Sequence, residues 1–219
     1  MKERGRLFVL SGFSGSGKGT IVKTLLRDHD NYILSVSMTT RAPRDEDREG
    51  VTYFFVTKEQ FEERIAAGAM MEYARYGDNY YGTPQSFVEE KLAEGYDVIL
   101  EIEAQGAMQI RKKAPDAVMM FLVTPTAAEL ERRLVGRGSE TQESLTKRLR
   151  QAWTELDYIP QYDYMVVNDD LEACAALIHR LVHTRPDECR PDAAVIAAFR
   201  EQLREILPRY GVTVDGAEG

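Results

Sequence analysis

The sequence predicts an α/β fold in which helices flank a parallel sheet. Short apolar runs alternate with helical patterns, and buried parallel strands form such runs because both of their faces are covered. The runs comprise residues 7–10, 97–102, 117–123 and 164–167. A glycine-rich segment, GFSGSGKGT at residues 12–20, separates the first run from a helical pattern at residues 21–26. This order of strand, loop and helix is a second indication of the same fold class.

The predicted helices rest on capping signals and on apolar side chains at helical spacing. Pro115 ends the helix predicted over residues 104–113, and Thr126 with Glu129 predicts a capping box at the start of the helix over residues 127–134. The patterns cover residues 104–113, 127–134, 141–158, 170–184 and 193–207. We expect the chain from residue 212 onward to be loose.

Residues 35–95 interrupt the alternation and predict an inserted subdomain. A strand is expected at residues 53–56 in a small antiparallel unit, and Thr57 with Gln60 predicts a capping box for the helix that follows. A second helix starts at Pro84. The segment is too rich in Tyr, Phe and Met to be a disordered linker.

Composition excludes several classes of protein. The 219 residues suffice for one substantial α/β domain with an insertion, and no apolar run approaches the ~18 residues of a membrane span. The first strand begins too close to the first residue for a signal peptide. The net charge of −8 disfavours a nucleic acid polymer as partner. Cys174 and Cys189 lack paired spacing, so we expect a reduced, cytoplasmic protein without a disulfide.

The loop at residues 12–20 is suited to the phosphates of a nucleoside triphosphate. Its glycines let backbone N–H groups turn toward phosphate oxygens, and the helix N-terminus adds partial positive charge. Lys18 can reach the β- and γ-phosphates. The usual pattern has Ser or Thr directly after the lysine, whereas here Gly19 takes that place and Thr20 follows one residue later. The alternative is a Gly/Ser-rich turn without a ligand.

Two carboxylates and two guanidiniums are further candidates for phosphate chemistry. Glu101 and Glu103 end an apolar strand, where they should point the same way and could hold Mg²⁺; a solvated strand end is the alternative. Arg41 and Arg44 predict a second phosphate site, with surface salt bridges as the alternative. The acidic run at residues 45–49 is interpreted as solvated and self-paired.

Glu72 follows two methionines and is a candidate for reading a purine base. A buried carboxylate could accept hydrogen bonds from N1–H and the 2-amino group of guanine, a pair that adenine does not offer. The hydroxyl of Ser37 could donate to guanine O6. Arg137 between two glycines, together with Arg148, suggests a lid that closes over a nucleotide and excludes water.

In their order and spacing these motifs resemble the guanylate kinase family over roughly residues 6–184. The resemblance rests on the loop at residues 12–20, on Glu72, and on the segments VSMTTRAPR at 36–44, YFFV at 53–56, NYYG at 79–82, EIEAQG at 101–106, GRG at 136–138 and VNDD at 167–170. It implies a P-loop NTPase-type parallel sheet with an inserted GMP-binding α+β subdomain and a helical lid. It also implies an enzyme that phosphorylates GMP and dGMP with ATP, by Mg²⁺-assisted in-line transfer.

The resemblance divides the chain into a kinase-like domain, residues 1–186, and a C-terminal helical extension with a loose tail, residues 187–219. Within the domain, the core comprises residues 1–34, 96–125 and 160–186, the GMP-binding subdomain residues 35–95, and the lid about residues 126–159.

The resemblance also assigns roles to single residues. ATP is bound by Gly12, Phe13, Ser14, Gly15, Ser16, Gly17, Lys18, Gly19, Thr20 and, near the adenine, Asn168. Guanine is read by Ser37 and Glu72, the GMP phosphate is held by Arg41, Arg44, Tyr53 and Tyr81, and Thr83 and Glu103 lie beside the nucleoside. Catalysis falls to Lys18, Arg44, Arg137 and Arg148, and Glu101 holds Mg²⁺ through water.

Three positions depart from the family pattern. The family often has Asp in place of Glu101 and Glu103, which leaves direct contact with the metal open. Gly19 suggests that phosphates and water hold most of the Mg²⁺. Phe13 stands where proline is frequent, and the sequence offers no interpretation of it. Two alternatives are a catalytically inactive, guanylate-kinase-like interaction domain and a kinase for another nucleoside monophosphate. The chain could be a monomer or a homodimer.

Overall fold

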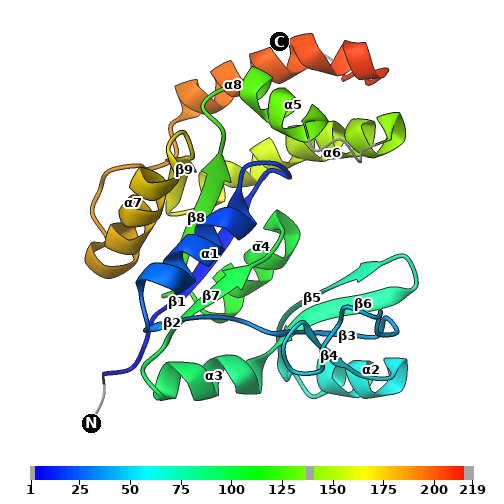
Figure 1. Ribbon diagram of the computed structural model, residues 1–219, viewed down its shortest axis with the longest axis vertical. Helices are drawn as coiled ribbons and strands as arrows, with labels where there is room; N and C mark the ends of the chain where they lie inside the picture. Colours follow the sequence, from blue (N-terminus) through cyan, green and yellow to red (C-terminus); the bar gives the residue numbers. More distant parts are fainter. Residues whose placement is uncertain (1–2, 137–140, 215–219) are drawn as a thin grey trace. The chain divides into compact units, whose positions relative to one another are not determined.

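The computed structural model describes residues 3–136 and 141–214 (Figure 1). The chain divides into two compact units, the first formed by Met1–Val9 and Leu25–Val118, the second by Leu10–Thr24 and Met119–Gly219. A five-stranded sheet has the strand order β2-β7-β1-β8-β9, with β2 and β7 parallel and β8 and β9 parallel. The α/β fold class is therefore confirmed.

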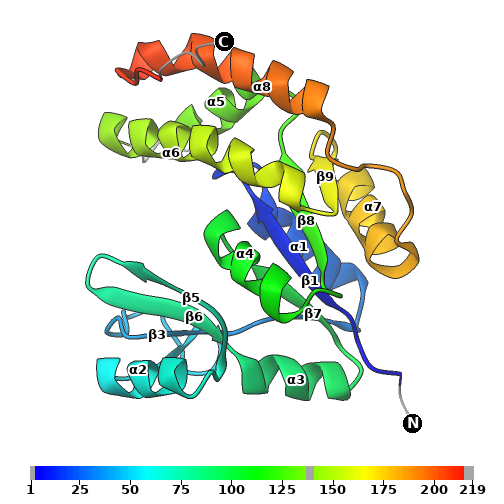
Figure 2. The same ribbon diagram turned by 180° about the vertical axis from the view of Figure 1, so that it is seen from behind.

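The first unit contains the whole inserted segment, residues 35–95. Its elements are β2 (Tyr32–Leu34), β3 (Ser37–Thr39), β4 (Tyr53–Phe55), α2 (Lys58–Ala66), β5 (Met70–Tyr76), β6 (Asn79–Pro84), α3 (Gln85–Ala93), β7 (Asp97–Glu101) and α4 (Ala104–Lys113). A second sheet has the order β4-β3-β6-β5, and α2 lies beside it (Figure 2). Phe61 of α2 packs in a buried cluster with Met38 and Met70, which gives this sheet its own core.

The expectation of a purely antiparallel unit was wrong in one respect. β5 and β6 pair antiparallel, as do β3 and β6, but β4 pairs parallel with β3. The chain between β3 and β4 is long enough to bring β4 back in the same direction. The capping box of α2 is confirmed, because Thr57 Oγ1 accepts from Gln60 N at 3.2 Å and Gln60 Oε1 accepts from Thr57 N at 3.0 Å.

The second unit carries the glycine-rich loop and the C-terminal half of the chain. β1 (Leu7–Gly12) and α1 (Lys18–Asp28) belong partly to each unit, and the remaining elements are β8 (Val118–Val123), α5 (Ala127–Val135), α6 (Gln142–Glu155), the 3₁₀ turn η1 (Leu156–Gln161), β9 (Tyr164–Val167), α7 (Leu171–Thr184), α8 (Ala193–Ile206) and the 3₁₀ turn η2 (Leu207–Tyr210). The helices α5, α6 and α8 lie side by side (Figures 1 and 2).

Three details of the second unit differ from expectation. The helix expected over residues 141–158 ends at Glu155, where a 3₁₀ turn containing Pro160 takes over. Thr126 does cap α5 by accepting from Glu129 N, but the Glu129 carboxylate accepts from two arginines. Val212 is buried, so the chain still packs onto the unit at residue 212, where loose chain was expected to begin.

Both cysteines are free thiols, as expected; Cys174 is buried and Cys189 is partly exposed. Burial raises the pKa of the Cys174 thiol to about 12, so this side chain stays protonated and unreactive at neutral pH. No helix in residues 3–136 and 141–214 is long and apolar enough to cross a membrane.

Candidate active site

The glycine-rich loop after β1 has the backbone that a phosphate site requires. Gly15 and Gly17 have φ angles of 89° and 98°, which favour glycine. The ammonium of Lys18 folds back over the loop and donates to the carbonyl oxygens of Gly12 at 2.6 Å and Phe13 at 3.2 Å. Lys18 therefore opens α1 with its charge held at the loop, where the helix N-terminus is also electropositive.

Side chains from distant parts of the second unit fix the loop. Asn168, which is buried, donates from Nδ2 to the carbonyl oxygen of Ser16 at 2.7 Å. Arg133 donates to the same carbonyl oxygen at 3.4 Å and to the carbonyl oxygen of Asn168 at 3.0 Å. A Cβ atom at Gly17 would lie 2.4 Å from Asn168 Nδ2, so only glycine allows this close approach. Arg133 is a residue that sequence reasoning missed.

A hydrogen bond between Arg148 and Ser14 connects helix α6, part of the predicted lid, to the loop. Arg148 of α6 donates from Nη1 to Ser14 Oγ. Arg132, by contrast, is exposed and pairs with Glu129 at 2.7 Å. Arg132 and Arg133 together lower the pKa of Glu129 to about 2, so this carboxylate is ionised whenever the protein is folded near neutral pH. Arg137 lies outside the described residues.

Ser16 and Phe13 are the buried side chains of the loop. Ser16 Oγ is a buried atom without a hydrogen-bond partner in the part of the chain that the structure describes. An orphaned hydroxyl at this place can donate to a phosphate oxygen. Phe13 is fully buried between Phe121 and Phe199, with ring centroids 5.1 and 5.2 Å away. Gly19 and Thr20 are exposed on the first turn of α1.

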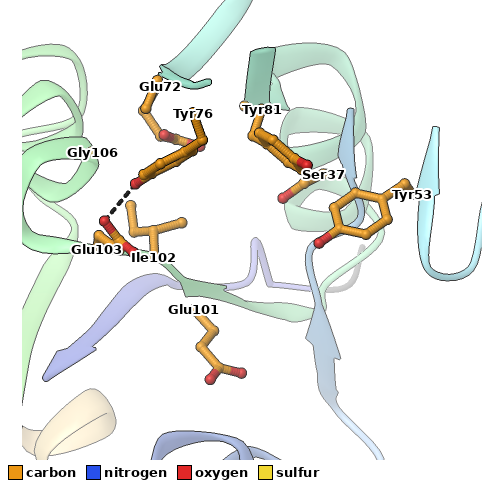
Figure 3. A pocket seen from close by; sticks show the side chains of 11 residues that line it. Ser37, Tyr53, Glu72, Tyr76, Tyr81, Glu101, Ile102, Glu103 and Gly106 are labelled. Atoms are coloured by element: carbon orange, nitrogen blue, oxygen red, sulfur yellow. Dashed lines mark hydrogen bonds between the residues drawn. The ribbon is translucent and has the colours of Figure 1, made fainter. Parts of the chain in front are cut away.

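A pocket of about 400 Å³ lies within the first unit (Figure 3). It is lined by Ser37, Tyr53, Glu72, Ala74, Tyr76, Tyr81, Gly82, Glu101, Ile102, Glu103 and Gly106. Six residues that the sequence singled out therefore meet here, although they come from the five strands β3 to β7 and the turn after β7. Its size suits one nucleotide rather than a polymer.

Glu72 is the buried anion of this pocket. Its side chain comes from β5, and Thr83 of β6, which is fully buried, donates from Oγ1 to Glu72 Oε1 at 2.8 Å. Burial raises the pKa of the Glu72 carboxyl above its usual value, and the hydrogen bonds from Thr83 oppose this shift only in part. Thr83 does not line the pocket; it orients the residue that does.

Side chains of helix α4 hydrogen-bond to strand β5 on both sides of Glu72. Gln109 donates from Nε2 to the carbonyl oxygen of Tyr73 at 2.8 Å and accepts from Tyr73 N at 3.2 Å. Lys113 donates to the carbonyl oxygen of Met70 at 2.6 Å. A Cβ atom at Gly106 would lie 2.7 Å from Glu72 Oε2. Gln109 was missed from the sequence, because a lone polar residue on a helix carries no signal of its partner.

The resemblance implies GMP as the ligand of this pocket, and on that expectation Gly106→Ala should raise the KM for GMP by about tenfold, because the new methyl group displaces the Glu72 carboxylate or crowds a bound base. Steady-state kinetics with varied GMP measures this effect. Gln105→Ala, a change at an exposed neighbour on the same helix, is the control and should leave the KM unchanged. An unchanged KM in Gly106→Ala would contradict the packing argument.

The two strand-end carboxylates do not point the same way. β7 ends at Glu101, and Glu103 is already the N-cap residue of α4, so strand alternation no longer applies between them. Glu103 accepts a hydrogen bond from the hydroxyl of Tyr76 at 2.5 Å. Figure 3 shows the Glu101 carboxylate directed away from this pair. The expectation of parallel carboxylates was wrong, and Tyr76 is a pocket residue that the sequence did not indicate.

Arg41 lies beside the pocket tyrosines. Its guanidinium stands 5.5 Å from the ring centroid of Tyr53 and pairs with Asp47 at 2.8 Å. The N–H of Arg44 also donates to Asp47 at 2.7 Å, and together these donors lower the pKa of the Asp47 carboxyl. The interpretation of residues 45–49 as self-paired was therefore wrong: the run supplies the counter-ion of Arg41. The Arg44 side chain is exposed.

The described residues contain no group of three or more His, Cys, Asp or Glu side chains that could hold a metal ion. Glu101, at the end of β7 and at the pocket wall, is the carboxylate that the sequence assigned to such an ion.

The fold and the two sites define a class of protein: an α/β protein with a glycine-rich loop that has the backbone of a phosphate site in one unit, and a nucleotide-sized pocket with a buried carboxylate in the other. The family model described as "Guanylate kinase" matches residues 4–185. The chain belongs to the guanylate kinase family. The resemblance seen in the sequence is thus confirmed.

Individual relatives agree with the family model. The chain is 48% identical to a guanylate kinase of Clostridium perfringens over 189 residues, which cover 86% of this chain and 87% of the relative. It is 46% identical to a guanylate kinase of Streptococcus mutans over 209 residues, covering 95% of this chain and 98% of the relative. The crystal structure of guanylate kinase from Anaplasma phagocytophilum matches with a TM-score of 0.64 and 32% identity, covering 94% of this chain and 97% of that one.

Proposed function

We propose that this enzyme transfers the γ-phosphoryl group of ATP to GMP, producing ADP and GDP, and that dGMP is accepted as well. Family membership supports the reaction. The observation that carries the choice of base is the buried Glu72 carboxylate in a nucleotide-sized pocket. The intact loop with Lys18 argues against an interaction domain that has lost catalysis.

The pocket of the first unit is the GMP site in this proposal. Glu72, oriented by Thr83, accepts hydrogen bonds from guanine N1–H and the 2-amino group, and Ser37 donates to O6. Adenine offers no such pair of donors, so it would leave a buried carboxylate unsatisfied. Tyr53, Tyr81 and the Arg41 guanidinium, which lies 5.5 Å from the Tyr53 ring centroid, hold the monophosphate in this proposal together with Arg44, and Glu103 lies beside the nucleoside.

The loop of the second unit is the ATP site. Backbone N–H groups of residues 12–20, the hydroxyl of Ser16 and the ammonium of Lys18 hold the phosphates. Arg148 adds a positive charge at the loop, and we assign Arg137 to the same closing segment. Asn168 supports the loop through its hydrogen bond to the carbonyl oxygen of Ser16 and is proposed to lie near the adenine.

Transfer is direct and in line. A phosphate oxygen of GMP attacks the γ-phosphorus, a new P–O bond forms, and the bond from that phosphorus to the β–γ bridging oxygen breaks with its electron pair leaving on ADP. The monophosphate oxygen is already a nucleophile, so no side-chain base is required. The protein contributes positioning, exclusion of water and neutralisation of charge.

Mg²⁺ is proposed as the cofactor. The donor set fits, because Mg²⁺ commonly takes one or two carboxylates together with substrate phosphates and water, and Glu101 supplies one carboxylate. When bound, the ion neutralises charge on the phosphates. We further propose a cytoplasmic protein in which residues 35–95 form the GMP-binding subdomain and about residues 126–159 the lid.

A coupled assay of ADP formation tests the proposal across GMP, dGMP, AMP, CMP and UMP with ATP. We expect turnover with GMP and dGMP and little with the others. Preference for a different monophosphate would contradict the assignment of Glu72. No ADP formation with any of the acceptors would favour the catalytically inactive interaction domain.

We expect the KM for GMP to rise as the pH falls toward the raised pKa of Glu72, because only the ionised carboxylate accepts both guanine donors. Because this pKa is raised, the rise of the KM should begin at a pH above 4.5, the usual pKa of a glutamate carboxyl. The GMP phosphate also titrates, with a second pKa of about 6, so the KM profile of Glu72→Gln serves as reference. The ratio of the two profiles isolates Glu72, and a ratio that does not change with pH would contradict this account.

A further inference from the structure

The C-terminal helix α8 contacts the phosphate-binding loop directly. The family match ends at residue 185, so α8 lies beyond it. Phe199 of α8 stacks on Phe13 of the loop, with centroids 5.2 Å apart and ring planes at 24°. Phe13 in turn meets Phe121 of β8 edge to face. Both Phe13 and Phe199 are buried, so the contact is shielded from water.

Phe13 is also the residue on which the turn of the loop is built. Its carbonyl oxygen accepts from Ser16 N at 3.0 Å and from Lys18 Nζ at 3.2 Å. A shift of the Phe13 ring moves this carbonyl, and with it the ammonium and the backbone donors that face a phosphate. Because interiors are close-packed, removing the ring stacked on Phe13 leaves a void into which it can relax.

The extension supports the loop by a second route through α5. Gln202 of α8 accepts from the N–H of Ala127, one of the first-turn donors that no helix carbonyl satisfies. Tyr210, just after α8, donates from its hydroxyl to Glu131 at 2.8 Å. The same helix α5 carries Arg133, which donates to the carbonyl oxygen of Ser16. The extension thus holds both the loop and the helix that buttresses it.

We propose that Phe199 is a positioning residue for the phosphate-binding loop, acting through Phe13, and that the C-terminal extension thereby sets the affinity of the enzyme for ATP. The inference rests on the proposed function in that ATP is the ligand of the loop. It gives a reason for an aromatic residue at position 13, which the sequence left without an interpretation.

The test compares Phe199→Ala with Ile206→Ala in the full chain. Ile206 is as buried as Phe199 and lies two turns further along α8, where it faces Thr126 and Ala128. Both variants should lower the Tm. Phe199→Ala should raise the KM for ATP by about 3- to 30-fold with the KM for GMP unchanged, and Ile206→Ala, at a residue that lies against α5 rather than in the Phe13 stack, should raise the KM for ATP by a clearly smaller factor. Phe199→Leu, which keeps apolar volume, should recover most of the affinity and also serves if the alanine variant fails to fold.

A double-mutant cycle with Phe13→Ala tests the route. If Phe199 acts through Phe13, the double variant should bind ATP no more weakly than the worse single variant. Equal effects of Phe199→Ala and Ile206→Ala on the KM for ATP, or simply additive effects in the cycle, would overturn the proposal.

Calorimetric titration of each variant with a non-hydrolysable ATP analogue separates this inference from the proposed function. A wild-type protein that binds the analogue but does not phosphorylate GMP would refute the proposed function, while the comparison of Phe199→Ala with Ile206→Ala would still decide the role of Phe199. Unchanged affinity for the analogue in Phe199→Ala would refute that role, even if GMP is phosphorylated normally.

Discussion

Lys18→Met is expected to lower kcat for GMP phosphorylation by roughly 10²- to 10³-fold, the usual cost of removing one preorganised donor from a site of developing charge. The Lys18 ammonium is held at the loop by the carbonyl oxygens of Gly12 and Phe13, at 2.6 and 3.2 Å. Methionine keeps most of the length and apolar volume of the side chain but removes the charge, so the loop should keep its fold. The loss should therefore fall mainly on kcat.

Lys23→Met is the matched control for this variant. Lys23 is exposed on the same helix α1, so its removal changes the net charge of the protein by the same amount without touching the loop. Rapid-mixing or steady-state kinetics at saturating ATP and GMP measures kcat for both. A Lys18→Met enzyme within threefold of wild type, or a Lys23→Met enzyme equally impaired, would contradict the role of Lys18.

The second large effect is expected from Glu72→Gln, which should lower kcat/KM for GMP by about 5- to 150-fold, or about 1–3 kcal/mol. The amide of glutamine offers one acceptor in place of two and turns an N–H group toward the guanine donors. Thr83 still donates to the remaining oxygen, so the fold around the pocket should survive. AMP has no pair of donors for the two oxygens of the Glu72 carboxylate, so activity with AMP should not fall in parallel.

The measurement for Glu72→Gln is the ratio of kcat/KM for GMP to that for AMP. Glu63→Gln, an exposed change on α2 of the same unit, controls for the loss of one negative charge. A variant at Glu72 that keeps the full preference for GMP would show that another group reads the base.

The elements predicted best from the sequence were those whose signals are local. β9 and α4 have the predicted bounds, because an apolar run between polar residues and a helical pattern before Pro115 are both complete within the segment. β6 was not predicted, since Asn79, Gly82 and Pro84 within its six residues favour turns. Only its pairing with β3 and β5 makes it a strand.

The same distinction holds for the site. The loop at residues 12–20 and the carboxylate of Glu72 stand out by composition. The contacts of Arg133 and Phe13 could not be predicted, because their partners lie far along the chain: Arg133 bonds to Ser16, 117 residues away, and Phe13 stacks on Phe199 near the other end. Such pairs arise from packing of elements that no local pattern connects.

A single-turnover experiment with excess enzyme and ATP labelled in its γ-phosphate tests the central claim, direct phosphoryl transfer from ATP to GMP. The account predicts that the label enters the β-phosphate of GDP at the rate at which ATP disappears, that its transfer is far slower when AMP replaces GMP, and that the protein itself is never labelled. Labelled protein that forms before GDP, or label released as free phosphate whether or not GMP is present, would contradict it.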